Sequence, residues 1–276
     1  MPLMPWSETI LSFKTVIITG GSSGIGAELI NTLAKLRSKS SIINLSRTKP
    51  HIFAESFTVE HIPTDLSDPE SLAAAAVAVE KRIEASDEGP ILLINNSGFG
   101  NHGQFASAGQ DEVGMVHVNA LAVVDLTQRL LPSIKKRGGW IMTISSVAGF
   151  QPTPYLATYG AAKAFVMHWS LALNEELRGT GVRTLAVCPG PTKSSFFRRA
   201  GFDESPDVVR GQLPEEVALE AYKALHKGKS LVVTGGRNKL MAFMTHFFSK
   251  AFIARIARKL MQRFRLEAKT RAQLGA

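Results

Sequence analysis

TVIITGGSSGIGAELINTLAKL, residues 15–36, decides the fold of this chain. The run from Thr15 to Gly20 is short, apolar and rich in β-branched residues, which predicts a buried strand. The segment AELINTLAKL, residues 27–36, has apolar residues at helical spacing. The turn TGGSSGIG, residues 19–26, joins the two. A strand, a glycine-rich turn and a helix in this order form a site for a dinucleotide, because its pyrophosphate can bind backbone N–H groups at the helix N-terminus.

The alternation of apolar runs and helical patterns continues to about residue 234. We expect six further strands, at residues 41–46, 57–63, 91–95, 139–145, 182–187 and 230–234. We expect further helices at residues 68–84, at residues 110–131, in the stretch that carries Tyr159 as far as Leu177, and from Pro214 onward. Short apolar strands separated by helices predict a parallel sheet covered on both faces. The expected fold is α/β: a doubly wound, Rossmann-type parallel sheet of seven strands flanked by helices over residues 1–238, with a basic amphipathic helical tail at residues 239–276.

The composition fits an ordinary globular protein, with 45% hydrophobic and 20% charged residues in a chain of 276. Its one cysteine, Cys188, excludes an internal disulfide, and a reducing cytoplasm is the expected compartment. Because Cys188 ends an apolar run just before Pro-Gly, we expect a buried structural thiol rather than a nucleophile. No Cys/His spacing is typical of zinc, so no metal site is expected. The first residues, MPLMPWSETILSF, do not resemble a signal peptide, and no apolar run is long enough to span a membrane.

The net charge of +9 is concentrated at the C-terminal end of the chain. Residues 239–276 contain nine Lys/Arg and one acid, whereas the preceding 238 residues contain 23 basic and 22 acidic side chains. An apolar patch opens this tail: Leu240, Met241, Phe243, Met244, Phe247 and Phe248. One predicted helical face then carries Ile253, Ile256, Ala257, Leu260, Met261 and Phe264, and the other carries Arg255, Arg258, Lys259, Arg263 and Arg265.

Three roles are open for this basic amphipathic tail. Our first expectation is that its apolar side packs on its own domain, over the substrate pocket or at a subunit contact. The second is peripheral contact with an anionic membrane. A nucleic-acid partner is not expected, because no fold motif or aromatic-rich basic groove of that kind is present.

The glycine-rich turn and the end of the second strand carry the first group of expected cofactor residues. Glycine at three turn positions permits a tight turn and a close approach of phosphates, although the spacing is G-x-x-x-G-x-G rather than G-x-G-x-x-G. Arg47 ends the second strand, where an arginine suits a ribose 2′-phosphate. We therefore expect NADP(H) in preference to NAD(H); a solvated arginine in a polar loop, near Lys49, is the alternative. The expected contacts of the turn are Gly20, Ser22, Ser23, Gly24, Ile25 and Gly26.

Six motifs follow one another in order over residues 13–236. They are TGGSSGIG at 19–26, Asp65-Leu66, NNSG at 95–98, Asn119 in HVNA, a serine–tyrosine–lysine set in ISSVAGFQPTPYLATYGAAK at 144–163, and PGPTKS at 189–194. With this set the chain resembles the short-chain dehydrogenase/reductase family, in its compact single-domain form. The resemblance implies an NAD(P)-dependent enzyme that transfers a hydride between a nicotinamide and a carbonyl or alcohol. It also implies a homodimer or a homotetramer.

The same resemblance implies roles for four catalytic residues. The family tyrosine follows its serine by thirteen positions, so Tyr159 pairs with Ser146, and Ser145 is a packing neighbour. Tyr159 exchanges a proton with the substrate oxygen, Ser146 polarises that oxygen, and Lys163, four residues along the same helix face, lowers the phenol pKa and binds the nicotinamide ribose. Asn119 keeps a helix kink and a water in a proton relay.

The resemblance extends to the remaining cofactor contacts. Asp65 and Leu66 are expected beside the adenine, and Ser97 departs from the alanine usual at its position. The expected contacts on the adenosine side are Asn95, Asn96, Ser97 and Gly98, and those around the nicotinamide are Tyr159, Lys163, Pro189, Gly190, Thr192 and Ser194.

Aromatic residues surround the expected substrate cleft. Phe99, Phe150 and Tyr155 flank it, and the segment from Ser195 to Leu213 carries Phe196, Phe197 and Phe202 with Arg198, Arg199, Asp203 and Glu204. These side chains indicate an apolar carbonyl or alcohol as substrate, or they close the pocket over the cofactor. The alternative to an enzyme is a catalytically idle protein of the same fold that senses NADP(H) or binds a membrane surface. The complete set of four expected catalytic residues argues for the enzyme.

Overall fold

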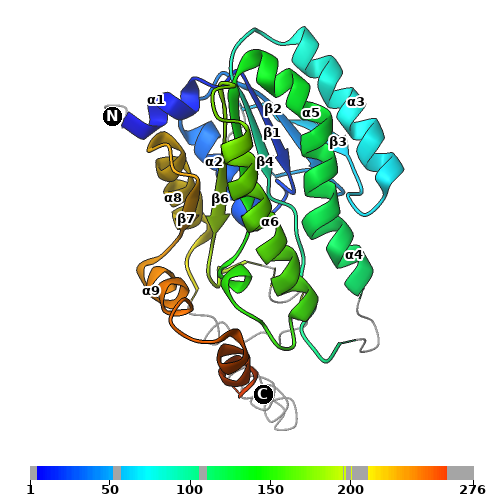
Figure 1. Ribbon diagram of the computed structural model, residues 1–276. Helices are drawn as coiled ribbons and strands as arrows, with labels where there is room; N and C mark the ends of the chain where they lie inside the picture. The colour runs from blue at the N-terminus through cyan, green and yellow to red at the C-terminus, as the bar shows by residue number, and fades with distance from the viewer. Residues whose placement is uncertain are drawn as a thin grey trace.

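The computed structural model describes residues 5–51, 57–105, 111–194, 196, 200 and 211–259 (Figure 1). Its centre is a parallel sheet of seven strands in the order β3-β2-β1-β4-β5-β6-β7. The strands are β1 (Thr15–Thr19), β2 (Ser41–Ser46), β3 (Glu60–Pro63), β4 (Ile91–Asn95), β5 (Gly139–Ile144), β6 (Val182–Cys188) and β7 (Leu231–Val233). The strand order reverses between β1 and β4, and ligands of such sheets bind at the carboxyl ends of the strands beside this point.

Helices cover both faces of the sheet. They are α1 (Pro5–Leu11), α2 (Gly24–Lys35), α3 (Pro69–Ala85), α4 (Glu112–Val116), α5 (Ala122–Arg137), α6 (Ala157–Glu176), α8 (Pro214–His226) and α9 (Gly236–Met244), with a π-helical turn η1 (His117–Leu121) and a 3₁₀ turn η2 (Val147–Phe150). Helices α1, α2 and α8 pack together on one face, and α3 and α5 pack together on the other, beside α6 (Figure 1). Alternate residues of each strand enter the two apolar cores; Val16 and Ile18 lie in one and Ile17 in the other. The predicted doubly wound α/β fold is confirmed.

Two element boundaries differ from the sequence prediction. The helix expected to stop at Leu131 continues through Pro132 to Arg137. Pro132 is exposed, so the carbonyl that loses its backbone partner can reach water, while Ile134 adds a buried turn to the apolar stripe. The edge strand β3 begins at Glu60 rather than at residue 57, because only its last four residues pair with β2.

The C-terminal segment folds back to the carboxyl end of the sheet (Figure 1). Helix α9 begins at Gly236, two residues before the predicted domain boundary, and a second helical stretch covers residues 250–259. The predicted tail residues Leu260, Met261, Arg263, Phe264 and Arg265 lie outside the described residues. Within the part of the chain that the structure describes, no helix is both long and apolar enough to cross a bilayer.

Candidate active site

The glycine-rich turn between β1 and α2 has the geometry of a phosphate cradle. Gly20 and Gly24 have φ of +68° and +56°, a left-handed conformation that glycine adopts without strain. A Cβ at Gly26 would lie 2.3 Å from the carbonyl oxygen of Gly20, so only glycine fits there. The turn therefore keeps its backbone bare at the N-terminus of α2, as a bound pyrophosphate requires. These residues fit the expected dinucleotide.

Asn96, after β4, holds the turn in place. Its Nδ2 donates to the carbonyl oxygens of Thr19 at 2.9 Å and of Gly20 at 3.0 Å. In return, the backbone N–H groups of Asn96 and Ser97 donate to Thr19 Oγ1, each at 3.0 Å. A contact that the sequence prediction missed comes from Asn44 in β2, whose Oδ1 accepts from the Gly21 N–H at 2.8 Å. The motif residues at the ends of β1 and β4 thus form one bonded unit.

The predicted residues of the adenosine side lie at the ends of β2, β3 and β4. Arg47 is exposed, and its charge helps to hold the pKa of the Asp65 carboxyl below its usual value. The larger cause is hydrogen bonding, because the Ser67 hydroxyl and N–H both donate to Asp65 Oδ1, at 2.6 and 2.9 Å. Leu66 is buried in the core, so only its backbone is available to a cofactor. Asn95 is also buried and donates to Thr127 Oγ1 at 3.0 Å, where it braces the sheet.

The segment after β6 approaches the glycine-rich turn from the other side. A Cβ at Gly24 would lie 3.3 Å from Cβ of Ser194, so the two segments nearly touch. Thr192 pairs with Gln212 in an isolated bridge, and its hydroxyl donates to the carbonyl oxygen of Gly190 at 3.0 Å. Pro189 accepts at its carbonyl oxygen from the Val147 N–H at 2.9 Å, which ties this segment to the end of β5.

Ser146 and Tyr159 are brought together at the carboxyl end of β5. Ser146 is the N-cap residue of the 3₁₀ turn η2, and Tyr159 lies in the first turn of α6 with its phenol near the Ser146 hydroxyl. Burial raises the pKa of the Tyr159 phenol to about 12, and the neighbouring Ser146 hydroxyl offsets part of this rise. Burial is the largest cause in the chain alone, and the lowering of the phenol pKa expected from Lys163 and the positive nicotinamide stays a prediction. The neighbour Ser145 points elsewhere and donates to the carbonyl oxygen of Lys163 at 2.7 Å.

Lys163 lies beneath this pair as a buried ammonium. Its Nζ is 5.8 Å from the centre of the Tyr159 ring and donates to the carbonyl oxygen of Ile144 at 2.9 Å. Burial lowers the pKa of Lys163 to about 8, because the charged form has lost its hydration. The thiol of Cys188 is also fully buried, and burial raises its pKa to about 12, which agrees with a structural cysteine.

Asn119 lies in the π-helical turn η1, which interrupts the helix between α4 and α5. Its amide clamps the backbone of Phe99: Oδ1 accepts from the Phe99 N–H at 3.0 Å, and Nδ2 donates to the Phe99 carbonyl oxygen at 2.7 Å. Gly98 lies between Asn119 and Lys163, where a larger side chain would not fit. A Cβ at Gly98 would lie 2.6 Å from Asn119 Oδ1 and 3.1 Å from Lys163 Nζ. The predicted kink at Asn119 is thus present as a π-bulge, a feature frequent at functional sites.

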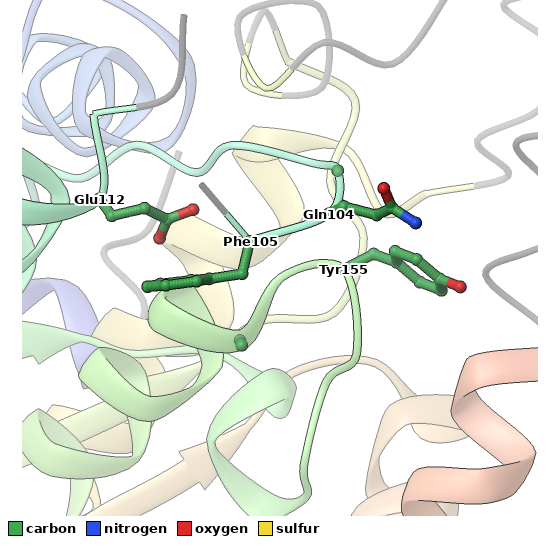
Figure 2. Close-up of a pocket in the computed structure, with 6 residues that line it drawn as sticks. Gln104, Phe105, Glu112 and Tyr155 are labelled. Carbon is green, nitrogen blue, oxygen red and sulfur yellow. The ribbon is translucent and has the colours of Figure 1, made fainter. Parts of the chain in front are cut away.

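Aromatic side chains close the space above the phenol. The rings of Tyr159 and Phe196 are 5.3 Å apart, and Gly100 leaves room for both. Next to them, a cavity of about 190 Å³ opens between the segment after β4, α4 and the segment before α6 (Figure 2). Tyr155, at its wall, has φ of +67°, a strained backbone of the kind that collects at functional sites. The predicted substrate residues Phe197, Arg198, Arg199, Phe202, Asp203 and Glu204 lie outside the described residues.

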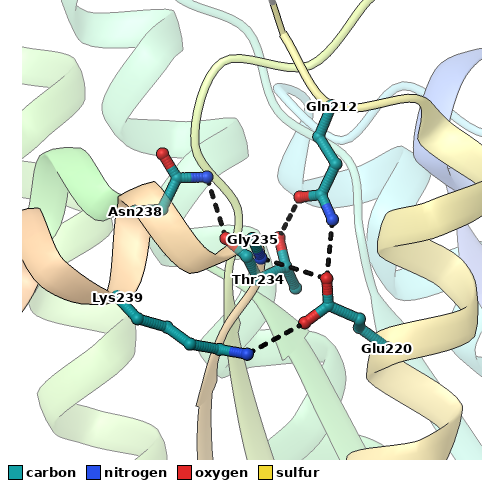
Figure 3. A network of polar contacts seen from close by, with 6 residues as sticks. All are labelled: Gln212, Glu220, Thr234, Gly235, Asn238 and Lys239. Carbon is teal, nitrogen blue, oxygen red and sulfur yellow. Dashed lines mark hydrogen bonds and ion pairs between the residues drawn. The ribbon is translucent and has the colours of Figure 1, made fainter.

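A polar network that the sequence did not predict joins the site to α9 (Figure 3). Glu220 of α8 accepts from Gln212 Nε2 at 2.7 Å and from the Gly235 N–H at 3.0 Å, and it pairs with Lys239 at 3.4 Å. Asn238 donates to the carbonyl oxygen of Thr234 at 2.8 Å and lies directly against Gly190. These residues come from three separate segments, at 212, 220 and 234–239, and belong to no motif, so no sequence signal could have found their contacts.

No group of histidine, cysteine and acidic residues suited to a metal ion occurs within the described ranges. The geometry is instead that of a dinucleotide site beside a serine–tyrosine–lysine set, on a Rossmann-type sheet. The residues that build it come from the ends of β1, β4, β5 and β6, all at one edge of the sheet.

Comparison with known proteins agrees with this geometry. The family model "short chain dehydrogenase" matches residues 14–204. The ketoacyl reductase HetN of Nostoc sp. is 31% identical over 247 residues, which cover 86% of this chain and 83% of that protein. The very-long-chain 3-oxoacyl-CoA reductase of Neurospora crassa is 34% identical over 183 residues, which cover 60% of this chain and 52% of that protein. A solved short-chain dehydrogenase from Sphingobium yanoikuyae in complex with NADPH is 30% identical, with a TM-score of 0.69 and coverage of 80% of this chain and 87% of that chain.

The chain therefore belongs to the short-chain dehydrogenase family. It is an NAD(P)-dependent oxidoreductase that acts on CH–OH or C=O groups. Solved structures at 20–24% identity share the fold, and those proteins are described in complex with NADP, NADH or NAD.

Proposed function

We propose that the protein reduces apolar carbonyl compounds with NADPH and that Tyr159 is the proton donor. The observation that carries this proposal is the position of the buried Lys163, whose Nζ lies 5.8 Å from the centre of the Tyr159 ring, next to Ser146 at the carboxyl end of β5. A phenol with its pKa raised to about 12 carries its proton at neutral pH, as a general acid must. The charges of Lys163 and of the bound nicotinamide would lower this pKa toward the working pH.

Each of the four predicted catalytic residues has a role that its contacts support. NADPH, when bound, supplies the hydride. Tyr159 gives its phenolic proton to the substrate oxygen, and the Ser146 hydroxyl donates a hydrogen bond to the same oxygen as it gains negative charge. Lys163 holds a positive charge below the phenol and stabilises the phenolate left behind. Asn119 acts as a positioning residue, because it fixes Phe99 and the space around Lys163.

The preference for NADPH rests on Arg47. It is exposed at the end of β2, and it is the residue that would bind a 2′-phosphate. In the variant Arg47→Asp we expect the Kd for NADPH to rise by about ten- to a hundredfold, as for the loss of a charged hydrogen bond, while NADH binds equally well or better. Lys49→Asp, two residues away, is the matched control. Equal loss in both variants, or none in either, would show that Arg47 does not select the cofactor.

The substrate class that we propose is a 3-oxoacyl thioester. The half-buried rings of Phe99, Phe150, Tyr155 and Phe196 give the space near Tyr159 an apolar wall. The names of the two relatives, a ketoacyl reductase and a very-long-chain 3-oxoacyl-CoA reductase, point to the same chemistry. The experiment is a series of 3-oxoacyl thioesters of increasing chain length, with turnover followed by the loss of NADPH absorbance. We expect kcat/KM to rise with chain length; equal rates for short polar ketones would contradict an acyl substrate.

The homodimer or homotetramer implied by the family stays a proposal. It is supported by an apolar strip on α4, η1 and α6 that the single chain leaves exposed. The strip consists of Val113, Val116, Leu121 and Phe165, with exposed fractions of 69%, 38%, 50% and 48%. Light scattering with the variant Phe165→Glu tests it, because a charge in the centre of this strip is expected to yield monomers.

A further inference from the structure

Large apolar side chains gather on the outside of the C-terminal segment. Fifteen large hydrophobic side chains are exposed among the described residues, and eight of them lie between residues 240 and 256. We call these eight the tail surface: Leu240, Met241, Phe243, Met244, Phe247, Phe248, Phe252 and Ile256. An exposed apolar group of this size marks a binding surface, because monomeric proteins seldom leave one uncovered.

Four of the rings on the tail surface lie in two contacting pairs. The rings of Phe243 and Phe247 are 5.0 Å apart, and those of Phe248 and Phe252 are 5.5 Å apart. On the other side of the same segment, Ala242 and Thr245 are buried against the body of the protein. The segment is thus seated on the domain by its small residues and turns its large apolar residues outward, so packing on its own domain, one form of the first expectation, does not account for the large ones.

All the charged side chains of this segment are basic. Residues 239–259 contain five basic side chains, at positions 239, 250, 255, 258 and 259, and no acidic one. The body of the chain is almost neutral by contrast, with 23 basic and 22 acidic residues before position 239. A cluster of four to eight Lys/Arg beside an apolar helical face is the pattern that binds anionic lipid headgroups.

The segment is held at the active-site end of the molecule. Lys239 pairs with Glu220 within the network of Figure 3. Lys250 donates to the carbonyl oxygen of Phe150 at 2.7 Å, four residues after Ser146. Figure 1 shows α9 and the helix after it at the same end of the sheet as the start of α6. Whatever covers the tail surface therefore lies at the same end of the sheet as the segment that follows Ser146.

We propose that the tail surface binds an anionic lipid membrane, with its apolar side chains in the headgroup region and its basic side chains against the lipid charge. Charge decides between this occupant and a second copy of the chain. Two tail surfaces facing each other would bring ten basic and no acidic side chains together, twice the five of one copy, whereas an anionic bilayer neutralises them. The site would then face the bilayer surface.

Sedimentation with vesicles tests this proposal. The full chain is mixed with vesicles of phosphatidylcholine alone or of phosphatidylcholine with phosphatidylglycerol. We expect binding only to the second kind, and release by high salt. The double variant Phe243→Ser/Phe247→Ser is expected to bind at least about tenfold more weakly. Val77→Ser removes an apolar side chain that is 56% exposed on α3, far from the tail, and is the matched control.

A second pair of variants separates charge from apolar contact. Arg255→Glu/Arg258→Glu is expected to weaken binding by roughly fivefold or more for each charge, and Lys81→Glu on α3 is its control. Unchanged melting temperatures and NADPH binding show that each variant is folded. The proposal is overturned if the wild type ignores anionic vesicles, if the tail variants bind as well as their controls, or if Phe243→Ser/Phe247→Ser lowers the molecular mass in light scattering without any change in vesicle binding. The last result would identify a second copy as the occupant.

Discussion

The site at the end of β5 and the tail surface lie at the same end of the molecule. Both depart from the usual distribution, in which polar side chains are exposed and apolar side chains are buried, and they do so in opposite ways. At the site, polar groups are inside: Asn119 is 0% exposed and Lys163 is 4% exposed. On the tail surface, apolar groups are outside: Leu240 is 63% exposed and Phe247 is 64% exposed. Both arrangements cost stability, because buried charge and exposed apolar area are each unfavourable. The contrast indicates that both regions are built for binding, one for a cofactor and substrate, the other for a larger surface.

The largest effect that separates the two regions is expected for Ser146→Ala. It removes the hydroxyl beside the phenol, which is the proposed donor for the substrate oxygen, so kcat should fall by about 10²- to 10³-fold, while vesicle binding stays unchanged. The control Ser145→Ala removes a hydroxyl that donates to the Lys163 carbonyl. It is expected to lower the melting temperature and to leave most of the turnover. The reverse ranking of the two serines in a steady-state assay would show that Ser145 is the functional one.

The next-largest effect compares two lysines that each donate to a backbone carbonyl oxygen. Lys163 is buried in the site, and Lys250 is exposed in the tail. Lys163 is buried and its pKa is lowered from 10.5 to about 8, so the folded chain releases this proton before the unfolded chain does. Stability should therefore rise with pH between about 8 and 10.5, by roughly 3 kcal/mol at most, and this rise should vanish in Lys163→Met. Chemical unfolding at a series of pH values measures it, with the exposed Lys250→Met as the control for loss of a lysine. An identical pH dependence in wild type and Lys163→Met would contradict a buried ammonium.

The smallest effect compares two glycines at the starts of helices. A Cβ at Gly26 in α2 would lie 2.3 Å from the Gly20 carbonyl oxygen, so Gly26→Ala should cost about 1–3 kcal/mol and weaken NADPH binding. Gly236 in α9 has open space around it, and Gly236→Ala should change stability by no more than about 1 kcal/mol, in the favourable direction. Thermal unfolding of both variants is the measurement. Equal losses of stability in the two variants would mean that the backbone at Gly26 is packed no more tightly than the backbone at Gly236.

Local chemistry explains how much of the fold the sequence predicts. Strands β2 and β4 occur at the predicted residues, because each is an apolar run and its polar neighbours fix where the strand begins and ends. The start of α3 at Pro69 also agrees, and Asp68 accepts from the Glu70 N–H there as an N-cap. The passage of α5 through Pro132 was missed, because the burial of Ile134 overrides a local stop signal.

The residues of the candidate site also divide into those that the sequence predicts and those that it does not. Gly20 and Asn96 directly follow β1 and β4 at the carboxyl end of the sheet, and Tyr159 lies in the first turn of α6, as the sequence predicts. The network around Glu220 and the outward direction of Phe247 depend on contacts between distant segments. Hydrophobic periodicity shows which residues share a helical face. It does not show whether that face packs on the rest of the protein or is exposed.

Single-turnover reduction by Tyr159→Phe is the most direct test of the central claim. The variant keeps the ring that packs against Phe196 and loses only the phenolic hydroxyl, which carries the proton. With NADPH bound at saturation, we predict that the rate of NADPH loss on addition of a 3-oxoacyl thioester falls by about 10²- to 10⁴-fold, the range for loss of a general acid, while the Kd for NADPH changes little. A rate equal to that of the wild type would show that Tyr159 is not the proton donor.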